Sequence, residues 1–156
     1  MFSRHERNVQ SKESPLAFKS ILVPVNGTEA STMAVEFACT IAKRTRGKVH
    51  VVHVIEVKRA LPLDADLTEE AQRGEDILTQ AENAARRQDF EVEGDLLQAR
   101  DAGHAIVDEA LERQADAIII GVPFKRPFGD FELSRVPAHV LRTAQCEVVL
   151  LRMPAE

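Results

Sequence analysis

The sequence predicts a three-layer α/β sandwich built on a mainly parallel five-stranded sheet. Five short apolar segments alternate with four longer segments of helical periodicity, an order typical of a parallel sheet covered by helices on both faces. One segment, residues 116–121, is apolar on both faces and therefore predicts a central strand. The length of 156 residues suits a single domain.

The first strand and the first helix are marked at both ends. Residues 18–26 form an apolar run that closes with Asn26 and Gly27, which predicts a buried strand followed by a turn. Thr28 is a suitable N-cap residue, and apolar residues then recur with helical spacing as far as Ala42. Gly47 is the expected stop of this helix.

The second and third strands enclose the longest helical segment. Residues 49–57 are rich in β-branched side chains and predict a strand. After a loop over residues 58–66, a long helix is expected from Leu67 to about Gln88, with Thr68 as its cap. Residues 92–99 alternate imperfectly and predict a weaker, peripheral strand.

The last two helices flank the predicted central strand. Asp101 opens a helix with one apolar face, and a further helix is expected around residues 133–141 before a final strand over residues 146–151. Ligands of such sheets bind beyond the carboxyl ends of the strands, where the strand order reverses. The segments to search are therefore Asn26-Gly27, the residues from Glu56 onward, and residues 121–135.

Composition limits the classes of function. Residues 1–17 are polar and non-periodic and predict a mobile tail before a domain at residues 18–153. The net charge of −5 and the absence of Trp and Tyr argue against a broad nucleic-acid-binding surface. Neither an apolar run of about 20 residues nor a signal sequence is present, so direct membrane insertion is not expected. Two cysteines without a CxxC pair favour a reducing, cytoplasmic setting.

The common enzyme signatures are missing. Asn26 stands where a receiver domain needs an acidic pair, and neither a dinucleotide motif, a phosphate loop nor a hydrolase elbow occurs. His50 and His53 are three residues apart on a strand and point to opposite faces, so we expect no metal site from this pair. Cys39 and Cys146 fit packing positions better than nucleophile positions.

Several segments become recognisable when they are taken in order. These are ILVPVNGTEAS at residues 21–31, VHVI at 52–55, ADAIIIG at 115–121, VPAHVLR at 136–142 and CEVVLLR at 146–152. Together they resemble the universal stress protein (UspA) family over about residues 18–152. The resemblance implies a Rossmann-like sandwich of the universal stress protein type, with no catalytic residues.

The resemblance also implies a degenerate ATP site. ATP-binding members carry an aspartate after the first strand, where this chain has Asn26, and G-x2-G-x9-G-[S/T] after the fourth. Gly121 matches the first glycine, but the second and third glycines become Phe124 and Ser134, and the hydroxyl position becomes Arg135. The candidate cofactor-binding residues are Pro24, Val25, Asn26, Val54, Gly121, Phe124, Ser134 and Arg135.

The substitutions have opposing consequences for an anionic ligand. Glycines let backbone N–H groups approach phosphates, so the Phe124 ring is expected to lie where phosphate oxygens should be. Asn26 can still donate or accept a hydrogen bond to a ribose, without the strength of a carboxylate. Lys125, Arg126 and Arg135 lie near the start of a helix, where their side chains could hold an anion. In the alternative, Lys125 and Arg126 form a solvated turn.

Four functions are considered, with no certain cofactor. The first is a non-catalytic regulatory domain without standard ATP binding, which forms a homodimer through its apolar last strand, as relatives of this family commonly do. The second is a sensor of ATP, AMP or another anion through Asn26, Gly121 and the basic residues. The third is an interaction role, because the residues after Gly121 resemble stress domains attached to membrane amino-acid transporters. The fourth function, an ATP hydrolase, has the least support, because no base or metal-binding carboxylate stands beside Gly121.

Overall fold

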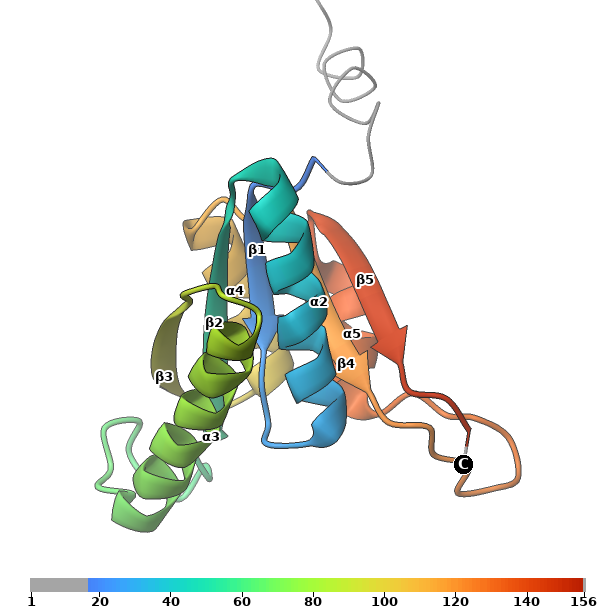
Figure 1. The fold of residues 1–156 in the computed structure, drawn as a ribbon. Helices are drawn as coiled ribbons and strands as arrows, with labels where there is room; N and C mark the ends of the chain where they lie inside the picture. The colour runs from blue at the N-terminus through green and yellow to red at the C-terminus, as the bar shows by residue number, and fades with distance from the viewer. Residues whose placement is uncertain (1–16, 156) are drawn as a thin grey trace, which may run out of the picture.

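The computed structural model describes residues 17–155, so the predicted tail at residues 1–17 lies outside the described residues except for Ala17. Five strands and four helices alternate along this part of the chain (Figure 1). In chain order they are β1 (Ser20–Pro24), α2 (Glu29–Thr45), β2 (Lys48–Glu56), α3 (Thr68–Arg87), β3 (Glu93–Ala99), α4 (Ala102–Glu112), β4 (Ala117–Val122), α5 (Arg135–Thr143) and β5 (Glu147–Arg152). None of these helices is long and apolar enough to cross a membrane.

The sheet has the predicted class. Its strand order is β3-β2-β1-β4-β5, and every pairing between neighbours is parallel. Figure 1 shows α2 and α3 on one face and α4 and α5 on the other. The strand over residues 93–99 is an edge strand, as its irregular pattern predicts, and β4 lies inside the sheet between β1 and β5.

The core consists of two aliphatic layers, one on each face of the sheet. Val23, Val51 and Ile119 belong to the layer beneath α2 and α3. Leu22, Val52 and Ile118 belong to the layer beneath α4 and α5. Because successive side chains of a strand point to opposite faces, a run such as residues 117–122 contributes to both layers and is buried throughout.

Two of the three predicted N-caps are confirmed. The Thr28 hydroxyl accepts a hydrogen bond from the Ser31 N–H at 3.2 Å, and the Asp101 carboxylate accepts one from the His104 N–H at 2.9 Å. The prediction for Thr68 is wrong, because it is the first helical residue of α3 and Leu67 precedes it as the cap. The Thr68 hydroxyl donates instead to the Asp66 carboxylate at 2.6 Å, so it binds the loop rather than the helix.

The two cysteines have the character of packing residues. Cys39 is fully buried in α2 beneath the first aliphatic layer, and burial raises the pKa of its thiol to about 11. Burial also raises the pKa of Cys146, which is partly exposed at the start of β5. Neither thiol is activated as a nucleophile, since a reactive cysteine needs a lowered pKa.

The cap of α4 can be tested by mutation. Asp101→Ala is expected to lower the free energy of unfolding by about 1 kcal/mol at pH 7, because the His104 N–H loses its acceptor. That hydrogen bond is the main cause of a lowered Asp101 pKa, so its stabilising effect is complete above the carboxyl's usual pKa and disappears as the pH falls through the lowered value.

Urea unfolding of the wild type and the variant at pH 7 and at decreasing pH would measure this difference. Asp101→Asn is the control, because Asn caps helices as well as Asp but does not titrate. A difference between the wild type and Asp101→Ala that stays constant down to pH 3 would contradict the assignment.

Candidate functional site

A pocket lies where the strand order reverses. The chain passes from β1 to β2 on one side and later returns to add β4 on the other, so the carboxyl ends of β1 and β4 mark the switch point. The pocket there, which we call the β1–β4 pocket, has a volume of about 200 Å³. Six predicted site residues line it, namely Pro24, Val25, Asn26, Val54, Gly121 and Ser134.

The polar groups at the β1 end of this pocket are largely satisfied by the protein itself. The Asn26 side-chain oxygen accepts hydrogen bonds from the Thr28 N–H at 3.2 Å and from the Thr28 hydroxyl at 2.6 Å. Ser31 donates to the Thr28 carbonyl at 3.0 Å, and a ring nitrogen of His53 lies 2.7 Å from the Val25 carbonyl. Asn26 therefore keeps its amide N–H groups for a ligand, whereas its acceptor is already used.

Gly121 has a structural role that needs no ligand. A Cβ added at this position would lie 1.8 Å from the Ala30 carbonyl oxygen and 2.4 Å from its carbon. Since real Cβ atoms do not approach backbone so closely, the first turn of α2 can rest on β4 only if residue 121 is glycine. The one motif glycine kept at its expected place is thus required by packing alone.

Arg135 is committed to two carboxylates. Its Nη2 donates to both oxygens of Glu56, at 2.8 and 3.0 Å, and its Nη1 donates to Asp101 at 3.0 Å. The hydrogen bond and the charge of Glu56 raise the pKa of the guanidinium. This bridge joins the end of β2 and the starts of α4 and α5, so in this structure Arg135 pairs with carboxylates, and its binding of an anion stays a prediction.

Phe124 does not line the β1–β4 pocket, and the prediction that its ring lies where phosphate oxygens should be stays a prediction. The ring stacks on Phe131, with centroids 5.7 Å apart and an interplanar angle of 18°. The Arg152 guanidinium lies over it at 4.7 Å, and that of Arg126 lies 5.4 Å from its centroid. The segment between β4 and α5, which projects from the sandwich in Figure 1, therefore has its own aromatic and cationic cluster.

The start of α5 is a poor anion site. Ser134 is the N-cap residue, but its side chain makes no capping hydrogen bond. Pro137, the third helical residue, has no N–H to offer, so only Arg135 and Val136 present free backbone donors in the first turn. At the start of α4, carboxylates of the protein occupy the backbone donors that an anion would need. Glu56 accepts from the Ala102 N–H at 3.1 Å, and Asp101 caps the helix.

Comparison with known proteins decides the family. The model of the universal stress protein family matches residues 17–152. The chain belongs to the universal stress protein family. Universal stress protein MJ0531 of Methanocaldococcus jannaschii is 25% identical over 143 residues, which cover 88% of this chain and 84% of that protein.

Solved universal stress proteins confirm the fold. One from Archaeoglobus fulgidus has a TM-score of 0.74 and 25% identity, and it covers 85% of this chain and 97% of its own. Another structure from the same organism, in complex with dAMP, has a TM-score of 0.70 and 23% identity, with 86% and 98% of the two chains covered. The predicted Rossmann-like architecture of the universal stress protein type is therefore confirmed.

Three residues of this site are missed by sequence reasoning. Glu56 and Asp101 are partners of Arg135, and Pro137 removes a donor from α5. Only Pro137 carries a signal in the sequence, since a proline has no backbone N–H wherever it stands. The Arg135 bridge joins residues 34 and 79 positions apart, and no local pattern indicates such pairing.

Gly121→Ala separates packing from ligand binding. We expect a loss of about 3 kcal/mol or more in the free energy of unfolding without any nucleotide, because the new Cβ meets the backbone of Ala30. Gly129→Ala is the matched control, since that site has a φ of 92° but open space for a Cβ, and its cost should be nearer 1 kcal/mol. Equal losses in chemical denaturation would contradict this role of Gly121.

Proposed function

We propose that this universal stress protein domain is a non-catalytic, cytoplasmic regulatory module that does not bind ATP in the manner of the family's ATP-binding members. The observation that carries the proposal is the bridge from Arg135 to Glu56 and Asp101. It supports the proposal because the residue at the motif's hydroxyl position is already paired with two acidic groups.

The charge beside the β1–β4 pocket opposes a polyphosphate. Glu56 and Asp101 together carry two negative charges against the single positive charge of Arg135, so a phosphate entering here meets a net negative field. The neighbouring helix start offers two backbone donors instead of three because of Pro137. A phosphate would have to replace two charge-assisted interactions of Arg135 before it could form its own.

A second candidate function is the sensing of a smaller nucleotide. The β1–β4 pocket persists, and its walls combine apolar side chains such as Val52 and Ile106 with Asn26 and Ser134. A relative of the same fold is described in complex with dAMP. These observations favour a ligand with an apolar ring and few charges, such as AMP, over a triphosphate.

Titration calorimetry with ATP, AMP and adenosine distinguishes the two functions. The proposal expects no saturable isotherm for ATP at micromolar concentration. The double variant Glu56→Gln/Asp101→Asn keeps a helix cap but removes both acidic charges, and it is expected to strengthen ATP or AMP binding by roughly tenfold, or about 1.4 kcal/mol.

Arg135→Gln is the complementary variant. If AMP binds the wild type and this variant abolishes binding, the sensing function replaces the proposed one. Saturable ATP binding by the wild type would refute the proposal directly. Thermal unfolding of each variant shows whether the fold is retained.

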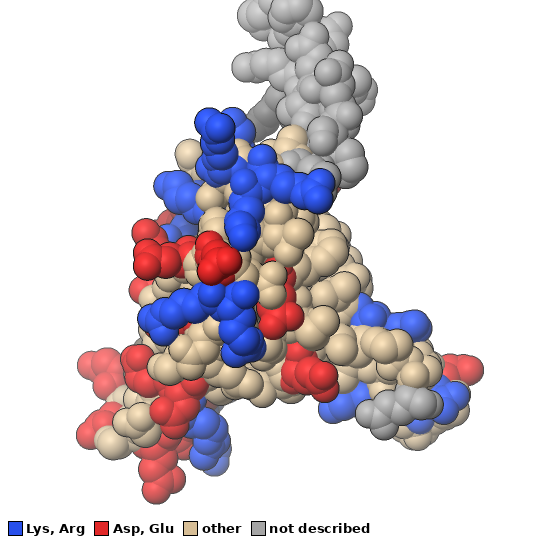
Figure 2. All heavy atoms as spheres, in the orientation of Figure 1, with Lys and Arg blue, Asp and Glu red and all other residues tan. Residues whose placement is uncertain are grey.

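We further propose that the domain is a homodimer paired through β5. This strand pairs with β4 on one side, and no described strand pairs with its other side. Its central residues, Val148 to Leu151, are apolar and only partly buried. Figure 2 shows a largely uncharged surface along β5 and the adjacent side of α2. Two large apolar side chains of α2, Met33 and Phe37, are exposed. An open apolar strand edge favours pairing with an identical edge.

Leu151→Glu tests this interface. Leu151 is partly exposed on β5, so a charge there should prevent edge pairing while the sandwich still folds. Light scattering is expected to give a dimer for the wild type at micromolar concentration and a monomer for the variant. Leu63→Glu, in the exposed loop after β2, is the matched control and should stay dimeric. A wild type that remains monomeric at high micromolar concentration would exclude the dimer.

An interaction with another protein is compatible with both proposals. The segment over residues 121–129 includes the exposed ring of Phe128, and its resemblance to transporter-attached stress domains is the reason for naming a membrane transporter as a candidate partner. No nucleic-acid partner is proposed.

A further inference from the structure

A second polar centre lies at the amino end of the sheet, opposite the β1–β4 pocket. We call it the His50 cluster, and it consists of His50, Glu93, Asp95, Glu109 and Arg113. His50 is near the start of β2, Glu93 and Asp95 are on β3, and Glu109 and Arg113 come from the end of α4. His50 faces the α4 side of the sheet, whereas His53 lies against Gly74 on the α3 side, as the strand period predicts.

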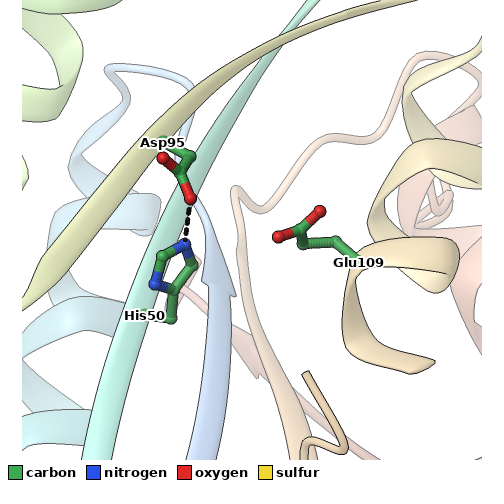
Figure 3. A group of neighbouring side chains, drawn as sticks. All are labelled: His50, Asp95 and Glu109. Atoms are coloured by element: carbon green, nitrogen blue, oxygen red, sulfur yellow. Dashed lines mark hydrogen bonds and ion pairs between the residues drawn. The ribbon is translucent and has the colours of Figure 1, made fainter. Parts of the chain in front are cut away.

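Arg113 already supplies a cation to one part of this cluster. Donor atoms of His50, Asp95 and Glu109 lie within 4.8 Å of one another, the arrangement drawn in Figure 3. The Arg113 guanidinium donates to Asp95 at 2.6 Å and to Glu109 at 2.6 Å. A metal ion between these two carboxylates would have to displace the guanidinium, so this triplet is not the better site.

The same arginine fixes the proton on His50. The Asp95 oxygen that accepts from Arg113 lies 3.0 Å from His50 Nε2, and a carboxylate oxygen can only accept. Nε2 therefore carries the hydrogen. In the neutral ring the lone pair is then left on Nδ1. A carboxylate that accepts from one imidazole nitrogen is the usual support of a histidine whose other nitrogen binds a metal ion.

Nδ1 of His50 is buried and has no hydrogen-bond partner among residues 17–155. The residue is 9% exposed, and Figure 3 shows this nitrogen on the side of the ring away from Asp95 and Glu109. Its nearest charged neighbour is the Glu93 carboxylate, 3.9 Å away. An unpaired buried nitrogen costs free energy, so its position calls for a ligand.

The geometry points to a binding site for a Zn²⁺-class divalent transition-metal ion between His50 Nδ1 and the Glu93 carboxylate, with Asp95 as the carboxylate that orients the ring. Bonds of about 2.0 Å at a tetrahedral ion place two ligand atoms roughly 3.3 Å apart, so the observed 3.9 Å must shorten slightly through a movement of Glu93. Because Nδ1 is buried, its surroundings must also open toward the hollow beside His50 to admit the ion. The Glu93 side chain is 82% exposed and free to make it. Water completes the coordination.

The surroundings suit a cation. The hollow beside His50, with a volume of about 440 Å³, is also lined by Glu91, Glu93 and Glu112, against the basic residues Lys48 and Arg113. Burial, followed by the charge of Arg113, lowers the pKa of His50.

Zinc binding by the full chain tests the site. Competition with a chromophoric chelator at pH 7.5 is expected to show one Zn²⁺ bound per chain. Glu93→Gln should weaken binding at least tenfold, His50→Gln should abolish it, and Asp95→Asn should weaken it ten- to hundredfold. Long-range ¹H–¹⁵N NMR spectra should show that the ion perturbs Nδ1 of His50 rather than Nε2.

Controls keep the proposal falsifiable. Because Glu93 is exposed, Glu93→Gln remains informative even if the buried His50→Gln variant fails to fold. His104→Gln removes an exposed histidine that lies 3.2 Å from Asp108, a pair of the same chemistry, and should leave affinity unchanged. The site is refuted if the wild type binds no zinc at millimolar concentration or if Glu93→Gln binds as tightly as the wild type. Loss of binding in Glu109→Gln with retention in Glu93→Gln would refute this ligand pair.

Discussion

The contact between the start of α2 and β4 at Gly121 is the constraint on which the rest of the site depends. β1 is the middle strand, and the chain leaves it through a short turn that must pass directly over β4 before α2 can cover the first aliphatic layer. Because the Ala30 carbonyl occupies the space that a Cβ would need, the two elements meet backbone to backbone. Asn26, from the turn after β1, and Gly121, from β4, both line the β1–β4 pocket beside this contact.

Gly121, the one motif glycine that this chain keeps, has a packing role instead of a phosphate-binding one. In the family's ATP-binding members, glycines after the fourth strand allow phosphates to approach the backbone, but here the surviving glycine serves helix packing. The other motif positions hold Phe124, Ser134 and Arg135, and each has a structural role in this chain. Phe124 stacks on Phe131, Ser134 is the N-cap residue of α5, and Arg135 pairs with Glu56. Retention of Gly121 is therefore no argument for nucleotide binding.

The fold could be predicted from the sequence because its determinants are local. The spacing of apolar residues and cap residues such as Thr28 and Asp101 specify each helix and strand. The alternation of strands and helices along the chain then specifies the parallel sheet. The cap prediction for Thr68 is wrong because Leu67 holds the cap position and Thr68 is already helical, and the Thr68 hydroxyl donates to Asp66. The pocket's position followed from strand order. Its charge did not, because the partners of Arg135 come from the ends of β2 and the start of α4.

The two ends of α4 explain why the His50 cluster is a candidate cation site while the Arg135 bridge opposes an anion. At each end an arginine binds two carboxylates, Glu56 and Asp101 at the start, Asp95 and Glu109 at the finish. Such exposed ion pairs contribute little free energy each, so their main effect is to fix the position of α4 over the sheet. At the start of α4, Arg135 pairs with Glu56 and Asp101, and the net charge of these three side chains is negative. At the end of α4, Asp95 accepts from Arg113 and lies beside Nε2 of His50, so the buried Nδ1 of His50 faces the exposed side chain of Glu93. The same structural device therefore closes the expected anion site and leaves a cation site open at the opposite edge of the sheet.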